Sequence, residues 1–439
     1  MQFFKSRIGL NWLRQGNKQR QTALKITIIS ALSLNLFSVS TPAQPIAAKS
    51  YIVVLKKDTN PSAVALEHAN IHALKLGFRY NNAIKGYSAR IPEARLARLK
   101  EDPRVLFISE DRPVSIAAQT IPTGIKRIQA NNSTTRSGNG SGAVNTPVAI
   151  IDTGIQSNHP DLKVVGGKDC VSNLNNYNDG NGHGTHVAGT VAAKDNTAGV
   201  VGVVPGTPLY AVKVLDSSGS GSTSSVICGI DWVTANAAIK GIKVANMSLG
   251  SPGTDDGNCG LLNLDAMHNA ICGSVDKGVT YVVAAGNSGE NFANSVPASY
   301  NEVLTVTAIS DFNGVAGGGA SATCRSDVDD TAADFSNFTT INSSEVGHTI
   351  AAPGTCINST WINSTYNTIS GTSMASPHVA GAVALCIASA KCANLTPSQI
   401  ITKMRSDAAA QPATYGFKDD PNSPNGDRYY GNLLYTGGY

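Results

Sequence analysis

The stretch PVAIIDTGIQSNHPDL (residues 147–162) decides the class of fold, because a short apolar run leads directly into a polar, turn-rich segment. An apolar run of this length, rich in β-branched residues, is typical of a strand buried on both faces of a sheet. Similar runs recur downstream with helical segments between them. They are LYAVKVL (209–215), VANMS (244–248), TYVVAA (280–285) and VLTVTAI (303–309), with helices expected at about 184–193, 222–240 and 264–277.

This alternation of strands and helices predicts an α/β fold. We expect a doubly wound, mostly parallel sheet with helices on both faces, which is a three-layer αβα arrangement. Functional residues of such sheets lie beyond the carboxyl ends of the strands. Asp152 ends the first run and Asn287 follows TYVVAA, so both are candidates for a site at that edge.

Residues 51–110 have a different pattern, which predicts a small α+β module without cysteine. The expected order is strand, helix, hairpin, helix and strand, as in the ferredoxin-like plan. A module of this size buries little surface and is marginally stable. The predicted elements are YIVVL (51–55), a helix at 62–75, a hairpin at 79–91, a helix at 92–100 and VLFISE (105–110).

The N-terminus has the pattern of a secretory signal. Six lysines and arginines within residues 1–25 precede an apolar run from Ile26 to Val39, and small residues follow. The run is shorter than the ~20 residues that span a bilayer, so we expect no retained membrane anchor. The sequence therefore predicts a signal peptide (1–48, cleaved between Ala43 and Ala48), a module (49–117) and a main domain (118–439).

Charge and cysteine content agree with an exported protein. Residues 1–117 carry 18 Lys/Arg and 7 Asp/Glu, whereas residues 118–439 carry 16 and 23, and this acidic balance argues against nucleic acid as a partner. All eight cysteines lie in the main domain and none forms a CxxC pair, which favours disulfides in an oxidising compartment over buried free thiols. Short separations favour the pairs Cys259–Cys272 and Cys386–Cys392.

Two further polar residues lie in unusual surroundings. His183 is part of NGHGTHVAGT (181–190), and Ser373 lies in GTSMASPHVAG (371–381) at the expected start of a helix, where free backbone N–H groups can stabilise an oxyanion. Each residue has an ordinary alternative, because a serine can cap a helix and a histidine can be structural. His186 fits that structural role. A zinc site made by His183 and His186 is disfavoured, since HxxH lacks the spacing and the glutamate of HExxH.

Three segments in this order, DTGIQSNHPDL (152–162), GHGTHVAGT (182–190) and GTSMASPHVAG (371–381), resemble the signatures of subtilisin-like serine proteases, the family that includes proteinase K. The resemblance covers residues 118–439. It implies that Ser373 is the nucleophile, His183 the general base and acid, and Asp152 the group that orients His183. It also implies an oxyanion hole formed by Asn287 and the Ser373 backbone N–H.

The resemblance further implies how a polypeptide substrate binds. The substrate would lie as an extended strand between two glycine-bearing edges, above an S1 pocket without an acidic side chain. We therefore expect broad specificity with small or apolar P1 residues, and no preference for basic ones. The edges are Gly219, Ser220, Gly221 and Ser248, Leu249, Gly250, and the pocket residues are Ala284, Ala285, Gly286 and Ser295.

A structural calcium site is also implied by the resemblance, since side-chain and carbonyl oxygens together suit Ca²⁺. A plain surface loop is the alternative, because a lysine places a cation beside the expected ligands. The expected ligands are the side chains of Gln119, Asp161 and Asn196 and the carbonyl groups of Lys194, Ala198 and Val200.

Residues 49–117 resemble the inhibitory I9-type propeptide of the same family, which implies a secreted, monomeric zymogen that cleaves itself after Ala117. Two other functions agree less well with the sequence. A catalytically inactive binding module would need a lost triad residue, and none is lost. A nucleotide-binding protein, suggested by SGNGSG (137–142), fails because these glycines precede a strand instead of following one.

Overall fold

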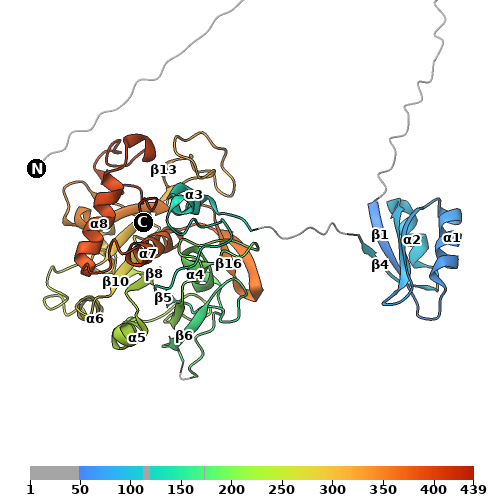
Figure 1. Ribbon diagram of the computed structural model, residues 1–439, viewed down its shortest axis with the longest axis horizontal. Helices are drawn as coiled ribbons and strands as arrows, with labels where there is room; N and C mark the ends of the chain where they lie inside the picture. The colour runs from blue at the N-terminus through green and yellow to red at the C-terminus, as the bar shows by residue number, and fades with distance from the viewer. Residues whose placement is uncertain (1–48, 112–118, 173) are drawn as a thin grey trace, which may run out of the picture. The chain divides into compact units, whose positions relative to one another are not determined.

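The computed structural model describes residues 49–111, 119–172 and 174–439, which form two compact units within residues 1–114 and 115–439 (Figure 1). The predicted signal peptide and the predicted cleavage site after Ala117 lie outside the described residues. Of the helices that are described, none combines the length and the apolar character needed to cross a membrane.

The first unit has the predicted β-α-β-β-α-β order. Its four strands form an antiparallel sheet in the order β2-β3-β1-β4, and ten buried apolar residues make up its core. The ferredoxin-like arrangement is therefore confirmed. The elements are β1 (Lys49–Leu55), α1 (Pro61–His72), β2 (Lys75–Tyr80), β3 (Lys85–Ile91), α2 (Glu93–Lys100) and β4 (Val105–Glu110).

The first helix of this unit ends earlier than the sequence predicts. Ala73 adopts the left-handed conformation (φ 54°) and donates its N–H to the Ala69 carbonyl, which closes α1 after His72. The released residues enter β2, which therefore begins at Lys75 and not at residue 79.

The second unit is built on an eight-stranded sheet in the order β13-β12-β10-β8-β5-β7-β6, with β15 also paired to β12. All pairings in this sheet are parallel except that of β13 with β12. The predicted mostly parallel sheet is therefore confirmed. The strands are β5 (Val148–Asp152), β6 (Val164–Asp169), β7 (Leu209–Lys213), β8 (Val244–Met247), β10 (Thr280–Ala284), β12 (Leu304–Ser310), β13 (Thr331–Ala332) and β15 (Thr349–Pro353).

Helices cover both faces of this sheet (Figure 1). Val148 and Ile150 of β5 pack in one core with α4, α7 and α8, whereas Ala149 and Ile151 pack in a second core with α5 and α6. This alternation along one strand confirms the three-layer αβα arrangement. The helices are α3 (Thr123–Arg127), α4 (His183–Ala192), α5 (Thr223–Lys240), α6 (Ala266–Val275), α7 (Thr372–Ala388) and α8 (Pro397–Ala409).

Helix α7 runs through the interior, where Thr372 and all residues from Met374 to Cys386 are buried, whereas Ser373 is partly exposed. Small residues let it pack closely on its neighbours, and a Cβ atom at Gly381 would lie 2.6 Å from the Cβ of Val203. A helix that is apolar on all sides belongs in a core. Its first turn is thereby held at a fixed place at the edge of the sheet.

Strand β6 was not predicted, because Gly166 and Gly167 weaken its β-strand pattern. The structure explains one of these glycines, since a Cβ at Gly167 would collide with the Ala211 carbonyl of β7. Other elements were also missed. They are the helices α3 and α8, the main-sheet strands β13 and β15, the hairpin β16 (Ile357–Trp361) and β17 (Thr365–Ile369), and the short strands β9 (Ser251–Pro252), β11 (Ser295–Val296), β14 (Thr339–Thr340) and β18 (Arg428–Tyr429).

All eight cysteines form disulfides, so the alternative of buried free thiols is wrong. The two pairs favoured by short separation are confirmed. Each disulfide stabilises the fold mainly by restricting the unfolded chain. The pairs are Cys170–Cys228, Cys259–Cys272, Cys324–Cys356 and Cys386–Cys392.

Candidate active site

Three neighbouring strands deliver polar residues to one edge of the sheet. Asp152 is the last residue of β5, Ser248 directly follows β8, and Asn287 lies three residues beyond β10. These strands are adjacent in the order β10-β8-β5 and run parallel. Their carboxyl ends therefore meet, as expected for a site in an open α/β sheet.

Asp152 and His183 form a close pair. The imidazole Nδ1 lies 2.8 Å from Asp152 Oδ1, which also accepts the Thr153 backbone N–H at 2.7 Å. Because the carboxylate can only accept, Nδ1 carries the proton and Nε2 is left as a base. Burial alone would lower the pKa of His183, but the charge and hydrogen bond of Asp152 outweigh it and raise the pKa above 6.5.

The N-terminus of α4 is held against Asp152 by a second buried carboxylate. Asp179 accepts hydrogen bonds from the Thr153 hydroxyl at 2.9 Å and from the backbone N–H groups of Gly182 and Thr185 at 3.0 and 2.9 Å. Gly184 permits the close approach, since a Cβ there would lie 3.1 Å from Asp152 Oδ1. Sequence reasoning missed Asp179, because an Asp-Gly pair in a turn is ordinary.

Ser373 lies in the first turn of α7. Its Oγ donates to the Ser248 carbonyl at 3.4 Å, and Ser248 Oγ donates to the Ser373 carbonyl at 3.0 Å. These contacts fix the start of α7 against the end of β8. In the described part of the chain no hydrogen bond joins Ser373 to His183, and such catalytic contacts are often long until substrate binds.

Asn287 is oriented by the residue that precedes Ser373. Its Oδ1 accepts the backbone N–H of Thr372 at 2.8 Å and the Thr372 hydroxyl at 2.9 Å. The hydroxyl of Thr372 in turn accepts the Gly286 N–H at 3.1 Å. With Oδ1 occupied in this way, the NH₂ group of Asn287 is the end of the amide that can donate to a ligand. The sequence carried no signal for this role of Thr372.

His186, in contrast, has no part in this site. It is fully buried and its Nε2 lies 2.9 Å from the Ile357 carbonyl and 3.1 Å from that of Asn367. Burial lowers its pKa to about 3, so the ring is neutral. The structural role expected for His186 agrees with these contacts.

Two adjoining cavities, each of about 570 Å³, lie along the edge of the sheet. The first includes His183 and the segment Gly219–Gly221, and the second includes Ser373, Asn287 and Ala284–Gly286. Every residue expected to contact substrate lines at least one of them. The wall that they share consists of Ser248, Leu249, Gly250, Ser251 and Val296.

One charged residue was not expected in this groove. Glu290 lines the second cavity together with Ala284, Ala285 and Ser295, and it is exposed. The cavity as a whole therefore carries one acidic side chain, in addition to the uncharged walls expected for the S1 pocket. Glu290 directly follows the motif AAGNSG and reaches the cavity through the path of the loop, where its N–H binds Asn337 Oδ1 at 3.2 Å.

Comparisons with known proteins agree with this geometry. The profile described as "Subtilase family" matches residues 144–432, and the profile "Peptidase inhibitor I9" matches residues 50–117. The chain belongs to the subtilase family. This subtilase is thus a subtilisin-type serine protease that carries an inhibitor I9 domain.

Individual relatives match along most of the subtilase chain. Subtilisin J of Geobacillus stearothermophilus is 36% identical over 391 residues, which is 87% of this chain and 91% of the relative. Subtilisin DY of Bacillus licheniformis is 42% identical over 296 residues, which is 66% of this chain and 92% of the relative. A solved structure of a cold adapted subtilisin-like serine proteinase matches with a TM-score of 0.54 and 33% identity, and covers 72% of this chain and 97% of its own.

The subtilase also brings together the residues expected at a calcium site. The amide nitrogen of Gln119 donates to the carbonyls of Lys194 at 2.7 Å and Val200 at 3.2 Å, and that of Asn196 donates to Asp161 Oδ1 at 3.0 Å. The Lys194 ammonium binds the Pro160 carbonyl at 2.6 Å.

This cluster has the donor chemistry that Ca²⁺ requires. Oxygens of Lys194, Val200 and Asp161 converge on two side-chain amides, and a flip of either amide presents a further oxygen. Burial raises the pKa of Asp161 above its usual value. Ala198, the sixth predicted ligand, lies beside Asn196 and donates its N–H to Asn196 Oδ1 at 3.1 Å.

Proposed function

We propose that this subtilase is a secreted endopeptidase in which Asp152, His183 and Ser373 form the catalytic triad. The observation that carries the proposal is the 2.8 Å pair of His183 and Asp152, whose imidazole lines a groove that continues to Ser373. A buried carboxylate fixes the tautomer, and the free Nε2 takes the serine proton. Ser373 Oγ attacks the scissile carbonyl, and His183 then returns the proton to the leaving amine.

The developing oxyanion would be stabilised by Asn287 Nδ2 and the Ser373 backbone N–H. Support comes from Thr372, which occupies Asn287 Oδ1 and so selects the donor end of the amide. The backbone N–H of Ser373 lies in the first turn of α7, where amide groups have no helical partner.

The substrate would be a polypeptide bound as an extended strand between Gly219–Gly221 and Ser248–Gly250, with its P1 side chain against Ala284–Gly286 and Ser295. Small and apolar P1 residues suit these walls. Exposed Glu290 adds tolerance for a basic P1 side chain without making it a requirement, because exposed ion pairs contribute little.

The inhibitor I9 unit would act as an intramolecular inhibitor until the enzyme cleaves itself after Ala117. A small P1 residue such as Ala117 suits the proposed pocket. We propose that the mature enzyme is a monomer without a membrane anchor, and that Ca²⁺ held by Gln119, Asp161, Lys194, Asn196, Ala198 and Val200 stabilises it.

Substitution of the nucleophile tests the central proposal. Full-length Ser373→Ala should stay unprocessed and inactive, whereas the matched Ser376→Ala variant, three residues further along α7, should keep its serine nucleophile and be processed. Both proteins should be expressed without added protease and analysed by mass spectrometry. Mature-sized Ser373→Ala protein would contradict self-cleavage, and wild-type activity that survives a serine-reactive sulfonyl fluoride would contradict the triad.

The calcium proposal has its own test. Excess EDTA should lower the melting temperature, because a ligand bound only by the folded state stabilises it by mass action. Asp161→Asn should lower it similarly and should remove most of the effect of EDTA. An unchanged melting temperature after long incubation with chelator would count against the site.

A further inference from the structure

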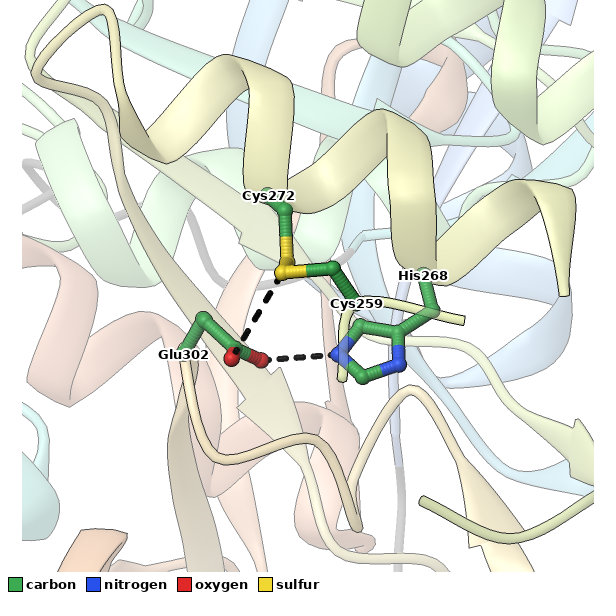
Figure 2. A group of neighbouring side chains, drawn as sticks. All are labelled: Cys259, His268, Cys272 and Glu302. Atoms are coloured by element: carbon green, nitrogen blue, oxygen red, sulfur yellow. Dashed lines mark hydrogen bonds and ion pairs between the residues drawn. A yellow bond between two sulfur atoms is a disulfide. The ribbon is translucent and has the colours of Figure 1, made fainter. Parts of the chain in front are cut away.

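A second group of metal-binding side chains lies outside the groove. His268 and Cys272 occupy successive turns of α6, Cys259 lies on the loop before this helix, and Glu302 precedes β12 (Figure 2). One donor atom from each of the four lies within 4.8 Å of the others. Among the described residues, no other disulfide belongs to such a cluster.

The donor set matches the chemistry of zinc. Two sulfurs, one imidazole nitrogen and one carboxylate oxygen are all ligands that Zn²⁺ binds at about 2.0–2.3 Å, so that tetrahedral ligand atoms lie roughly 3.3–3.8 Å apart. His268 Nε2 already lies 2.8 Å from Glu302 Oε2, and Cys259 Sγ lies 4.0 Å from Glu302 Oε1. Small side-chain movements would complete the tetrahedron.

The surroundings of the second ring nitrogen of His268, Nδ1, support zinc binding through Nε2. Its Nδ1 is buried without a hydrogen-bond partner in the described structure, and it faces carboxylate oxygens of Asp255 at 3.5 Å and Asp256 at 3.6 Å. A zinc-bound histidine commonly donates its other N–H to a carboxylate, which fixes the ring. Asp255 is therefore placed to orient His268 while Nε2 points toward the two sulfurs and Glu302 (Figure 2).

Asp256 itself is not a ligand. Its oxygens accept four backbone N–H groups of the loop at 2.8–3.0 Å, from Asn258, Gly260, Leu262 and Asn263. All four lone pairs of the carboxylate are thereby used. The loop that carries Cys259 is thus held in place by contacts other than its disulfide.

We propose that reduction of Cys259–Cys272 creates a Zn²⁺ site formed by Cys259, Cys272, His268 and Glu302. A dithiol reductant supplies two electrons and two protons to the disulfide and is oxidised to its own disulfide. Zn²⁺ then displaces the two thiol protons and binds both thiolates. Oxidation of the thiolates by a disulfide compound restores the bond and releases the metal.

Disulfide and metal are mutually exclusive in this site, because each sulfur either bonds to its partner or donates to zinc. Zn²⁺ therefore favours the reduced form, about 1,000-fold at a concentration 1,000 times its Kd. The loop leads directly from the groove segment Ser248–Pro252, so zinc would keep this wall crosslinked under reducing conditions. The inference is independent of the proposed proteolysis.

Metal titration tests the site. The full-length Ser373→Ala chain without a histidine tag, reduced with a phosphine, should bind one Co²⁺ with thiolate-to-cobalt charge-transfer absorption, and Zn²⁺ should abolish that absorption. Cys259→Ser/Cys272→Ser should lose the signal, whereas the control Cys386→Ser/Cys392→Ser should keep it. His268→Ala and Asp255→Asn should weaken binding at least tenfold. Equal signals from the two double variants would overturn the proposal.

A second measurement remains informative if full reduction unfolds the chain. The native protein should be equilibrated in a glutathione redox buffer with and without Zn²⁺, and each disulfide should be quantified by thiol labelling and mass spectrometry. Zinc should increase the reduced fraction of Cys259–Cys272 alone. The same reduced fraction with and without zinc would refute the site.

Discussion

Two histidines of the main unit, His183 and His268, each pair with a carboxylate but differ in their surroundings. One ring nitrogen of each histidine lies 2.8 Å from a carboxylate oxygen, of Asp152 for His183 and of Glu302 for His268. In both histidines the acidic partners raise the pKa of the imidazole against the effect of burial. His183 is 26% exposed and lines the groove, whereas His268 is 1% exposed and its second nitrogen faces Asp255 and Asp256.

The difference shows that a histidine–carboxylate pair does not by itself make a catalytic base. A general base needs its unprotonated nitrogen beside open space that a substrate can enter. His183 pairs through Nδ1 and lines such a cavity with its imidazole, whereas the free nitrogen of His268 is enclosed by acidic groups.

Substitution of His183 and of His268 by alanine should give the largest difference in catalytic activity. His183→Ala should lower kcat at least about 10⁴-fold, in line with triad losses measured in subtilisin. His268→Ala should keep kcat per folded molecule within a few-fold and should instead lower the melting temperature, because the partly buried carboxylate of Glu302 loses its partner. Active-site titration and thermal unfolding measure the two effects. A comparable loss of kcat in both variants would remove the distinction.

The oxyanion hole gives the next largest effect. Asn287→Ala should lower kcat about 10²–10³-fold with little change in KM, as for the corresponding donor of subtilisin. Thr372→Ser keeps the hydroxyl that holds Asn287 Oδ1 and serves as the matched control, with near wild-type kcat. A large rise in KM with unchanged kcat for Asn287→Ala would show that the amide binds ground-state substrate instead.

The dependence of activity on pH tests the role of His183. Proteolysis needs the neutral ring, so kcat/KM should fall about tenfold per pH unit below the pKa of His183. Because Asp152 raises that pKa, the midpoint of this acidic decline should lie at a higher pH than the 6.5 of an ordinary histidine. His268→Ala should leave the midpoint unchanged. A wild-type midpoint below pH 6 would contradict the raised pKa.

The smallest expected effect concerns Glu290. Glu290→Gln should lower kcat/KM for peptides with a P1 lysine by up to about fivefold, because an exposed ion pair contributes at most about 1 kcal/mol. Cleavage after leucine should be unaffected, and Glu345→Gln, outside both cavities, should change neither. Equal changes for lysine and leucine substrates would argue against an electrostatic role.

The sequence was informative where the signal lies in neighbours along the chain. Asp152, His183 and Ser373 each belong to a long local motif, and the apolar runs identify most strands of the main sheet. It was insufficient where partners are distant, as for Thr372 and Asn287, which are 85 residues apart.

The missed features share this cause. Asp179 acts through contacts made only after β5 and α4 are packed, and Glu290 reaches the groove through the course of its loop. Strand β6 depends on close packing against β7. Its glycines permit this packing, but glycines in a sequence do not by themselves indicate a strand. The Cys170–Cys228 and Cys324–Cys356 pairs span 58 and 32 residues and could not be chosen among 105 connectivities.

The late position of α7 along the chain has a consequence for the timing of biosynthesis. Asp152 is on the first strand of the main unit, but Ser373 is on a helix that leaves the ribosome after β5 to β17. A nascent chain that stops before this helix has the pair of Asp152 and His183 but lacks the Ser373 hydroxyl. Since α7 also forms much of the core, the earlier strands cannot pack fully without it. We therefore expect incomplete copies to be inactive in the producing cell, because α7, which is translated after all the strands of the main sheet, supplies both the proposed nucleophile and much of the core.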